Sequence, residues 1–159
     1  MYYTYLDTPI GELLLAGDQR ALYELGFPGG PKRRRAELGW ERRDTIFAEA
    51  KSQISQYFEG TRREFSLSLA PSGTPFQLSV LEELRKIPYG VTVSYRDIAM
   101  RLGKPQAMRA VGTANGRNPL PLIIPCHRVI GSNGKLTGFG GGLPTKEALL
   151  KLEQRVSKG

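Results

Sequence analysis

The first part of the chain alternates short apolar runs with polar turns, a pattern typical of a small antiparallel sheet. Three runs are expected to form a β-meander: Tyr2–Leu6, Glu12–Ala16 and Ala21–Phe27. After a break at 28–35, the apolar positions take up helical spacing. These positions are Ile46, Ala50, Ile54, Tyr57 and Phe58, and they predict a helix that ends at Gly60. The weakly alternating run Glu64–Leu69 is expected to be one more strand.

The second part of the chain has a mainly helical pattern. It follows a linker at 70–73, and Thr74, Pro75 and Gln77 have the form of a capped helix start. The apolar stripe of that helix is Phe76, Val80, Leu81 and Leu84. Two further helices, Tyr95–Leu102 with Ser94 as its cap and Gln106–Gly116, are joined by Gly103-Lys104-Pro105. This arrangement is typical of a helix-turn-helix, although a helix so rich in small residues is more often one that simply packs tightly against a neighbour.

We therefore expect an α+β protein of two parts. Residues 1–72 would form an N-terminal structural domain of β-meander and helix, and residues 73–159 a mainly helical domain that binds DNA. All of the net charge of +8 lies in the second part, after residue 75. This asymmetry favours a polyanion-binding half, but a basic solvated surface explains it equally well. The basic run 32–35 is consistent with a solvated loop.

Composition excludes several other classes of protein. No stretch approaches the roughly 18 uninterrupted apolar residues of a membrane span. With one cysteine in 159 residues, no internal disulfide can form, and one Cys with one His cannot complete a structural zinc site. The N-terminus has no basic segment ahead of an apolar block, so we expect no secretory signal and a cytoplasmic location.

The segment 122–130 carries the most specific chemical signal. It places the only cysteine, Cys126, and the only histidine, His127, between two apolar runs. Each alone is more often a structural residue. A thiol must become a thiolate to attack carbon, and an imidazole can supply the base. Because neighbouring side chains on an extended segment point apart, we expect His127 to reach Cys126 through a water or a local bend.

The motif Pro125-Cys126-His127-Arg128-Val129 resembles the signature of the O6-alkylguanine-DNA alkyltransferases, also called methylated-DNA–protein-cysteine methyltransferases. Further segments resemble that family in the same order: Val93–Tyr95, Arg109–Gly112, Asn118–Pro121, Gly141–Leu143 and Lys146–Leu150. The resemblance is strong over residues 74–153. It implies a ribonuclease H-like N-terminal module and repair by irreversible transfer of the O6-alkyl group to the protein.

The resemblance also implies a role for each catalytic residue. Cys126 would be the nucleophile and permanent acceptor, and His127 would take its proton through a water. Glu147 would orient the imidazole, and Asn118 would hold the hinge before the active site. Tyr95 would place its phenol near the flipped base and donate a proton to the leaving purine.

The remaining implied residues bind DNA or form the base pocket. Arg109 would enter the base stack and fill the space of the extruded nucleotide. The expected DNA-binding residues are Tyr95, Arg109, Ala110, Gly112, Thr113, Ala114, Asn115 and Arg117. The expected pocket residues are Pro121, Val129, Phe139 and Gly140. The expected partner is double-stranded DNA carrying O6-alkylguanine. We expect a monomer with no metal or cofactor, and leave activity on O4-alkylthymine and cooperativity on DNA open.

Three alternatives explain less of the sequence. An alkyltransferase-like protein binds the lesion but replaces the acceptor cysteine, which is present here. A helix-turn-helix regulator accounts for the charge and the helices, but leaves Cys126, His127 and Glu147 without a role. A cysteine hydrolase would need a histidine far from the cysteine in sequence, and this chain has no second histidine.

Overall fold

A four-stranded sheet forms the N-terminal part of the computed structural model, which describes all 159 residues. The sheet order is β3-β2-β1-β4. The three longer strands are β1 (Tyr2–Thr8), β2 (Gly11–Gly17) and β3 (Leu22–Gly26), and they form the predicted antiparallel meander. The short strand β4 (Glu41–Arg42) adds parallel to β1 and was not predicted. Four consecutive residues of β2, 13–16, are completely buried, so both faces of this central strand are covered.

The predicted helix of this part is present as α1 (Ala48–Glu59), preceded by a 3-10 turn η1 (Thr45–Phe47). It ends where Gly60 takes a left-handed conformation with φ of 80°, which glycine adopts without a Cβ clash. The strand predicted at Glu64–Leu69 is wrong. That segment is coil and makes one isolated bridge, between Leu69 and Leu22, because only two backbone hydrogen bonds join it to β3: Leu22 N–H donates to Ser68, and Ala70 N–H donates to Leu22.

The helices of the C-terminal part begin largely where local capping signals place them. Helix α2 (Pro75–Arg85) carries a capping box of Thr74 and Gln77. Helix α3 (Tyr95–Arg101) carries another, of Ser94 and Asp97. Helix α4 (Met108–Gly116) starts two residues later than predicted, and α5 (Leu143–Lys158) contains the segment 146–150 that resembles the family. Between α4 and α5 lie a 3-10 turn η2 (Cys126–Arg128) and the strand β6 (Val129–Ile130), which pairs in parallel with β5 (Val93–Ser94).

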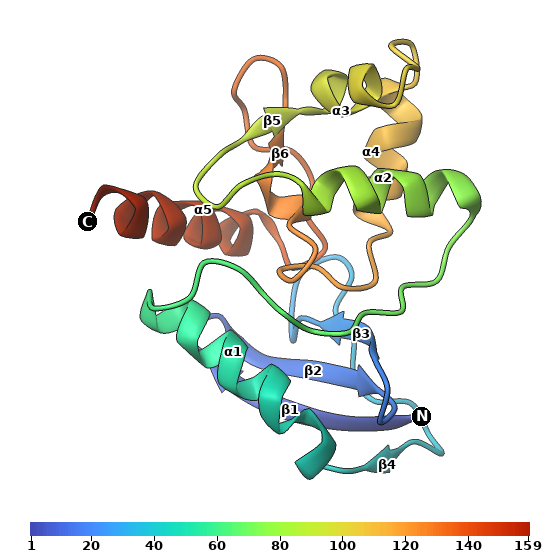
Figure 1. Cartoon of the computed structure of the whole chain (residues 1–159), viewed down its shortest axis with the longest axis vertical. Coiled ribbons are helices and arrows are strands. Elements are labelled where there is room, and N and C mark those ends of the chain that lie inside the picture. Colours follow the sequence, from blue (N-terminus) through green and yellow to red (C-terminus); the bar gives the residue numbers. More distant parts are fainter.

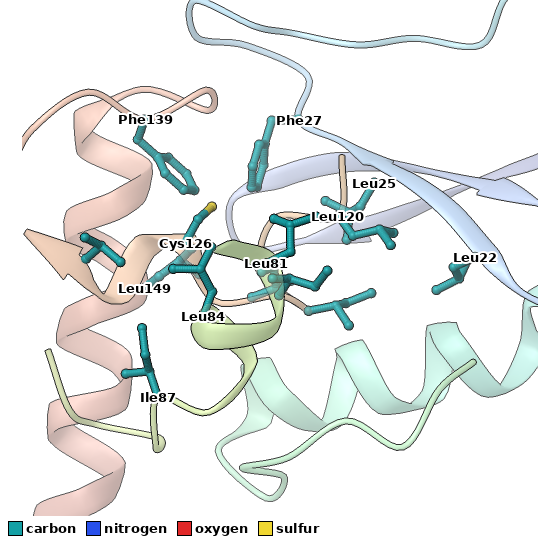
Figure 2. Close-up of a cluster of buried hydrophobic side chains, with 14 of the residues drawn as sticks. Leu22, Leu25, Phe27, Leu81, Leu84, Ile87, Leu120, Cys126, Phe139 and Leu149 are labelled. Atoms are coloured by element: carbon teal, nitrogen blue, oxygen red, sulfur yellow. The ribbon is translucent and has the colours of Figure 1, made fainter. Parts of the chain in front are cut away.

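The two parts share one core. Figure 1 shows the sheet and α1 at one end of the molecule and α2, α3 and α4 at the other. A continuous cluster of buried apolar side chains runs from β2, β3 and α1 into α2, the segment before Cys126 and α5 (Figure 2). The predicted α+β architecture is confirmed. The predicted boundary between residues 72 and 73 lies in the coil joining α1 and α2, and stays a prediction. No helix combines the length and hydropathy that crossing a membrane would require.

Candidate active site at Cys126

Cys126 lies on a tight turn and not on the extended segment that the sequence suggested. The 3-10 turn η2 bends the chain at Cys126, His127 and Arg128, and all three side chains are buried. Figure 2 shows the sulfur of Cys126 pointing toward the space between the rings of Phe27 and Phe139. Those rings lie 5.3 Å apart between centroids, so one aromatic residue from each part of the molecule flanks the thiol.

A pocket of about 140 Å³ opens onto Cys126. Three of the four predicted pocket residues line it, namely Pro121, Phe139 and Gly140. The fourth, Val129, is not among the lining residues, and its carbonyl oxygen accepts a hydrogen bond from Lys146. The N-terminal part contributes five lining residues that were not predicted: Glu24, Leu25, Phe27, Lys32 and Arg34. They are about one hundred positions from Cys126, so no local sequence signal could reveal them.

The carboxylate beside His127 belongs to Glu153, and the prediction of Glu147 is wrong. His127 Nε2 lies 2.7 Å from Glu153 Oε2, and Glu153 is 1% exposed. Glu147 instead lies on the outer face of α5, where it pairs with Lys151 at 2.9 Å. The physical reason is helical phase. The buried side of α5 is formed by Lys146, Leu149, Leu152 and Glu153, and residue 147 falls on the opposite side.

Glu153 is held by a dense set of donors. Arg128 donates to both of its oxygens, at 2.8 and 3.0 Å, and the hydroxyl of Tyr57 donates at 2.6 Å. The backbone N–H of Gly90 donates at 3.1 Å. Burial alone would raise the pKa of Glu153, but hydrogen bonds and charges from His127 and Arg128 outweigh it and hold that pKa well below its usual range. The carboxylate is therefore ionised and fixed in position.

This arrangement determines the tautomer of His127. Burial lowers the pKa of His127, which keeps the ring neutral, and the ionised Glu153 can only accept a hydrogen bond. Nε2 must then carry the proton and donate it to Glu153, which leaves Nδ1 unprotonated. Nδ1 is buried and has no partner in the protein. Its lone pair is free to accept a proton, as a general base requires.

In the free protein the thiol of Cys126 is almost entirely protonated. Burial raises the pKa of Cys126 to about 11, although the Asn118 side chain and the charge of Lys146 act in the opposite direction. Lys146 is completely buried, and its Nζ donates to the carbonyl oxygens of Val129 at 2.7 Å and Thr137 at 3.2 Å. No role of its own was predicted for Lys146 from the sequence. The buried ammonium fixes the backbone on both sides of the turn at 130–136 and favours negative charge on the sulfur.

Asn115, in the last turn of α4, and Asn118, just after it, lie against the Cys126 segment. Asn118 Nδ2 donates to the carbonyl of Ile124 at 2.9 Å, and its Oδ1 accepts from the N–H of Leu120 at 3.0 Å. These are hydrogen bonds from the Asn118 side chain to the backbone, of the kind predicted for a hinge. They close the loop in which Leu122 takes a positive φ of 76°. Asn115 is 5% exposed, and its Nδ2 lies 3.5 Å from the carbonyl oxygen of Cys126.

Helices α3 and α4 form the predicted helix-turn-helix, but α4 does not expose all of its predicted DNA-binding residues. Arg109, Ala110, Thr113 and Arg117 are exposed, and Gly112 is half-buried. Ala114 and Asn115 face inward, so predicting them as DNA contacts was wrong for their side chains. With Val111, they occupy positions i, i+3 and i+4 of the inner face.

Tyr95 lies beside α4 at the start of α3. A Cβ at Gly112 would meet the Tyr95 ring at 3.9 Å, so the two helices approach closely there. The Tyr95 hydroxyl shares a hydrogen bond with the hydroxyl of Thr137, on the loop 131–142 between β6 and α5. No group of three or more His, Cys, Asp or Glu side chains comes together in a way that could hold a metal ion.

Comparison with known proteins connects this geometry to a family. The family model described as "6-O-methylguanine DNA methyltransferase, DNA binding domain" matches residues 75–155. A second, "6-O-methylguanine DNA methyltransferase, ribonuclease-like domain", matches residues 1–71.

Individual relatives agree over nearly the whole chain. A methylated-DNA–protein-cysteine methyltransferase of Methanosarcina barkeri is 53% identical, over 97% of this chain and 98% of its own length. The constitutive methylated-DNA–protein-cysteine methyltransferase of Bacillus subtilis is 44% identical, over 98% and 96%. The crystal structure of Mycobacterium tuberculosis OGT in complex with DNA has a TM-score of 0.92 at 45% identity, and covers 98% of this chain and 94% of its own.

Proposed function

Since the chain belongs to the 6-O-methylguanine DNA methyltransferase family, we propose that it repairs DNA by taking the alkyl group of O6-alkylguanine onto Cys126. The protein is then a methylated-DNA–protein-cysteine S-methyltransferase, and each molecule of it reacts only once. The observation that carries this proposal is the buried His127–Glu153 hydrogen bond directly after Cys126 in sequence, with the Cys126 thiol in a pocket beside an exposed helix-turn-helix. A regulator that only binds DNA would not need a buried thiol next to a neutral histidine with a free ring nitrogen.

The first step is the formation of a thiolate. With a thiol pKa of about 11, only about one molecule in ten thousand is ionised at neutral pH without help. His127 Nδ1 accepts the thiol proton, through a water, and Glu153 stabilises the imidazolium that results. The positive charge of Lys146 favours the thiolate at the same time. The resulting thiolate is a strong nucleophile.

The second step moves the alkyl group. A bond forms between Sγ of Cys126 and the alkyl carbon, and the bond from that carbon to O6 of the base breaks. The bonding electron pair goes to the purine, which then takes up a proton. Tyr95 lies in the hollow next to the Cys126 pocket, and its phenol is the proposed donor. The product on the protein is a thioether. It cannot be exchanged by a second thiol, and this chain has no other cysteine.

The damaged base must flip out of the base stack of the duplex, because its alkyl carbon is not accessible to the thiolate inside the double helix. Arg109 projects from the exposed face of α4 and is the proposed wedge that fills the emptied space. The small exposed residues Ala110 and Thr113 allow the helix to approach the sugar–phosphate backbone. One chain supplies every residue named here, so we expect a monomer to act. A cytoplasmic location stays a prediction from the sequence.

The proposal is tested by replacing the acceptor. We expect Cys126→Ser to retain affinity for a duplex that contains O6-methylguanine and to lose transfer, since a hydroxyl is a much weaker acid than a thiol. Affinity is measured by fluorescence anisotropy, and transfer by the intact mass of the protein. Parent protein should gain one methyl group, located on Cys126 by peptide mapping. Transfer by the serine variant at the parent rate would contradict the proposal.

A further inference from the structure

Two hollows meet on the side of the molecule where α4 is exposed. The inner one, of about 140 Å³, contains Cys126, and the outer one, of about 290 Å³, is lined by Tyr95 and Gly112. The residues that line both are Lys32, Gly116, Gly138, Phe139 and Gly140. These five shared residues form the passage from the surface of α4 to the thiol, and we name them the passage residues.

Lys32 is the only passage residue with a long and exposed side chain. Three of the others are glycines, and Phe139 is buried against Phe27. The N–H of Lys32 donates to the carbonyl of Gly140 at 2.9 Å, and its Nζ donates to the carbonyl of Gly116. The side chain therefore runs across the passage, from the loop 131–142 to the last residue of α4.

The loop that carries Lys32 fits closely against the active site. A Cβ at Gly140 would lie 3.3 Å from the Cβ of Lys32, and a Cβ at Gly30 would lie only 2.4 Å from the backbone of Gly141. The backbone of this loop is thus held in place, whereas the far end of the lysine is attached by one exposed hydrogen bond. The four-carbon stem of lysine is flexible, so Nζ can leave Gly116 without moving the backbone.

We propose that Lys32 is a specificity-determining residue of the site. In the free protein its side chain lies across the passage to Cys126, and it must leave Gly116 before a bulky O6-substituent can reach the sulfur. Small substituents pass with less displacement. The inference rests on the proposed function, because it assumes that substrate reaches Cys126 from the α4 side. It assigns a task to part of the basic run 32–35, which the repair reaction had left without one.

The chain offers a matched control next to this residue. Arg33 carries the same charge on the same loop, makes no hydrogen bond or ion pair, and lines neither hollow. If charge on the loop were what mattered, Lys32→Ala and Arg33→Ala would have the same effect. Lys32→Arg retains a long donor that can reach Gly116, and it should behave like the parent.

The test compares two free bases, O6-benzylguanine and O6-methylguanine, and measures the second-order rate constant of each by the mass gain on Cys126. Dividing the rate constant for O6-benzylguanine by that for O6-methylguanine cancels any general effect of a substitution on the reactivity of the thiol. We expect Lys32→Ala to raise this ratio about threefold to tenfold, as when an open conformer rises from a minority to a majority. Arg33→Ala and Lys32→Arg should keep the parent ratio.

An unchanged ratio in Lys32→Ala would overturn the inference, as would an equal rise in Arg33→Ala. Either result leaves the proposed function intact, provided that the parent still gains the alkyl group on Cys126. If the parent were alkylated by neither base nor by a damaged duplex, the proposed function would fail first and the inference with it.

Discussion

Helices α4 and α5 both contact the Cys126 segment, but only α5 turns charged residues toward it. Helix α5 turns Lys146 and Glu153 inward, where both are almost completely buried and hydrogen-bonded. Helix α4 turns Val111 and Ala114 inward and leaves Arg109, and Arg117 at its C-terminal end, exposed. The inward charges of α5 set protonation states around the thiol, while the outward charges of α4 are available to DNA.

The difference shows how one small domain separates chemistry from binding. Charges buried on α5 need exact partners, because a buried ion without one costs several kcal/mol. Those partners come from distant elements, including Tyr57 of α1 and the backbone at Gly90. The exposed charges of α4 need no partner in the free protein, so they can change without disturbing the fold. The comparison therefore predicts large effects on folding and rate from α5, and effects confined to DNA from α4.

The largest effect should come from Glu153→Gln on the inner face of α5. The change removes the charge that balances Arg128, so we expect a loss of about 3–5 kcal/mol in the free energy of unfolding. It also removes the group that stabilises the His127 imidazolium, and transfer should slow by about 10²–10⁴-fold. Urea unfolding gives the first value, and single-turnover transfer at a temperature where the variant is folded gives the second.

Glu147→Gln, on the outer face of the same helix, is the matched control. It breaks only the exposed pair with Lys151, so the free energy of unfolding should stay within about 0.5 kcal/mol of the parent. The transfer rate should not change. If Glu147→Gln slowed transfer as much as Glu153→Gln, the assignment of Glu153 as the partner of His127 would be wrong.

The next largest effect should come from Arg109→Ala on α4. Arg109 makes no ion pair or side-chain hydrogen bond, so stability should be unchanged. Without the wedge, the transfer rate from duplex DNA should fall about tenfold to hundredfold. The reason is that the wedge offsets part of the few kcal/mol that unstacking the base costs. Reaction with free O6-benzylguanine should be unaffected. Arg117→Ala serves as the control. It should weaken binding to all duplexes and lower, by about one, the slope of the logarithm of the binding constant against the logarithm of salt concentration.

Equal losses by Arg109→Ala on the duplex and on the free base would show that this residue acts in the pocket and not in the base stack.

A smaller effect is expected from pH, and it depends on α5. The folded state lowers the pKa of His127 from its usual 6.5 and that of Glu153 from its usual 4.5. In both cases the unfolded chain therefore binds a proton more readily than the folded protein does as pH falls. The contribution of His127 and Glu153 to the free energy of unfolding is therefore fully present above about pH 6.5. It declines below that value through His127, and more steeply below about pH 4.5 through Glu153.

Thermal unfolding followed by circular dichroism across this range checks the prediction, with Glu153→Gln as the comparison. The variant should show a shallower decline below about pH 4.5, because Asp18, Asp44 and Asp97, whose pKa values are also lowered in the folded protein, still contribute to it. A parent melting temperature that stayed level between about pH 7 and pH 4 would contradict the protonation states assigned here.

The sequence predicted the elements that have a local signal. The capping boxes at Thr74 and Ser94 and the glycine at 60 fix helix ends within a few residues of chain, so they can be identified without the fold. The coil at 64–69 was predicted as a strand because weak alternation does not show whether a partner strand exists. The short strand β4 has two exposed residues and no hydrophobic pattern to reveal it.

The site was predicted where the family motif is contiguous, at 125–129, and missed where distant segments meet. Glu153 carries a signal that could have identified it: a glutamate on the apolar stripe that Lys146, Leu149 and Leu152 define once α5 is extended to its full length. No such signal exists for Phe27 or Lys32. Their place at the pocket depends on how the N-terminal part packs against the loop 131–142.

Whether Cys126 is the final acceptor of the alkyl group is tested most directly by the number of turnovers. Protein is mixed with an excess of duplex containing O6-methylguanine, and repaired DNA is counted against protein with methylated Cys126. A thioether has no acidic proton and does not exchange with thiols, so repair should rise to one equivalent per active molecule and stop. Every repaired base should correspond to one methyl group on Cys126. Continued repair beyond one equivalent, or a methyl group that leaves Cys126 without added reagents, would contradict the account.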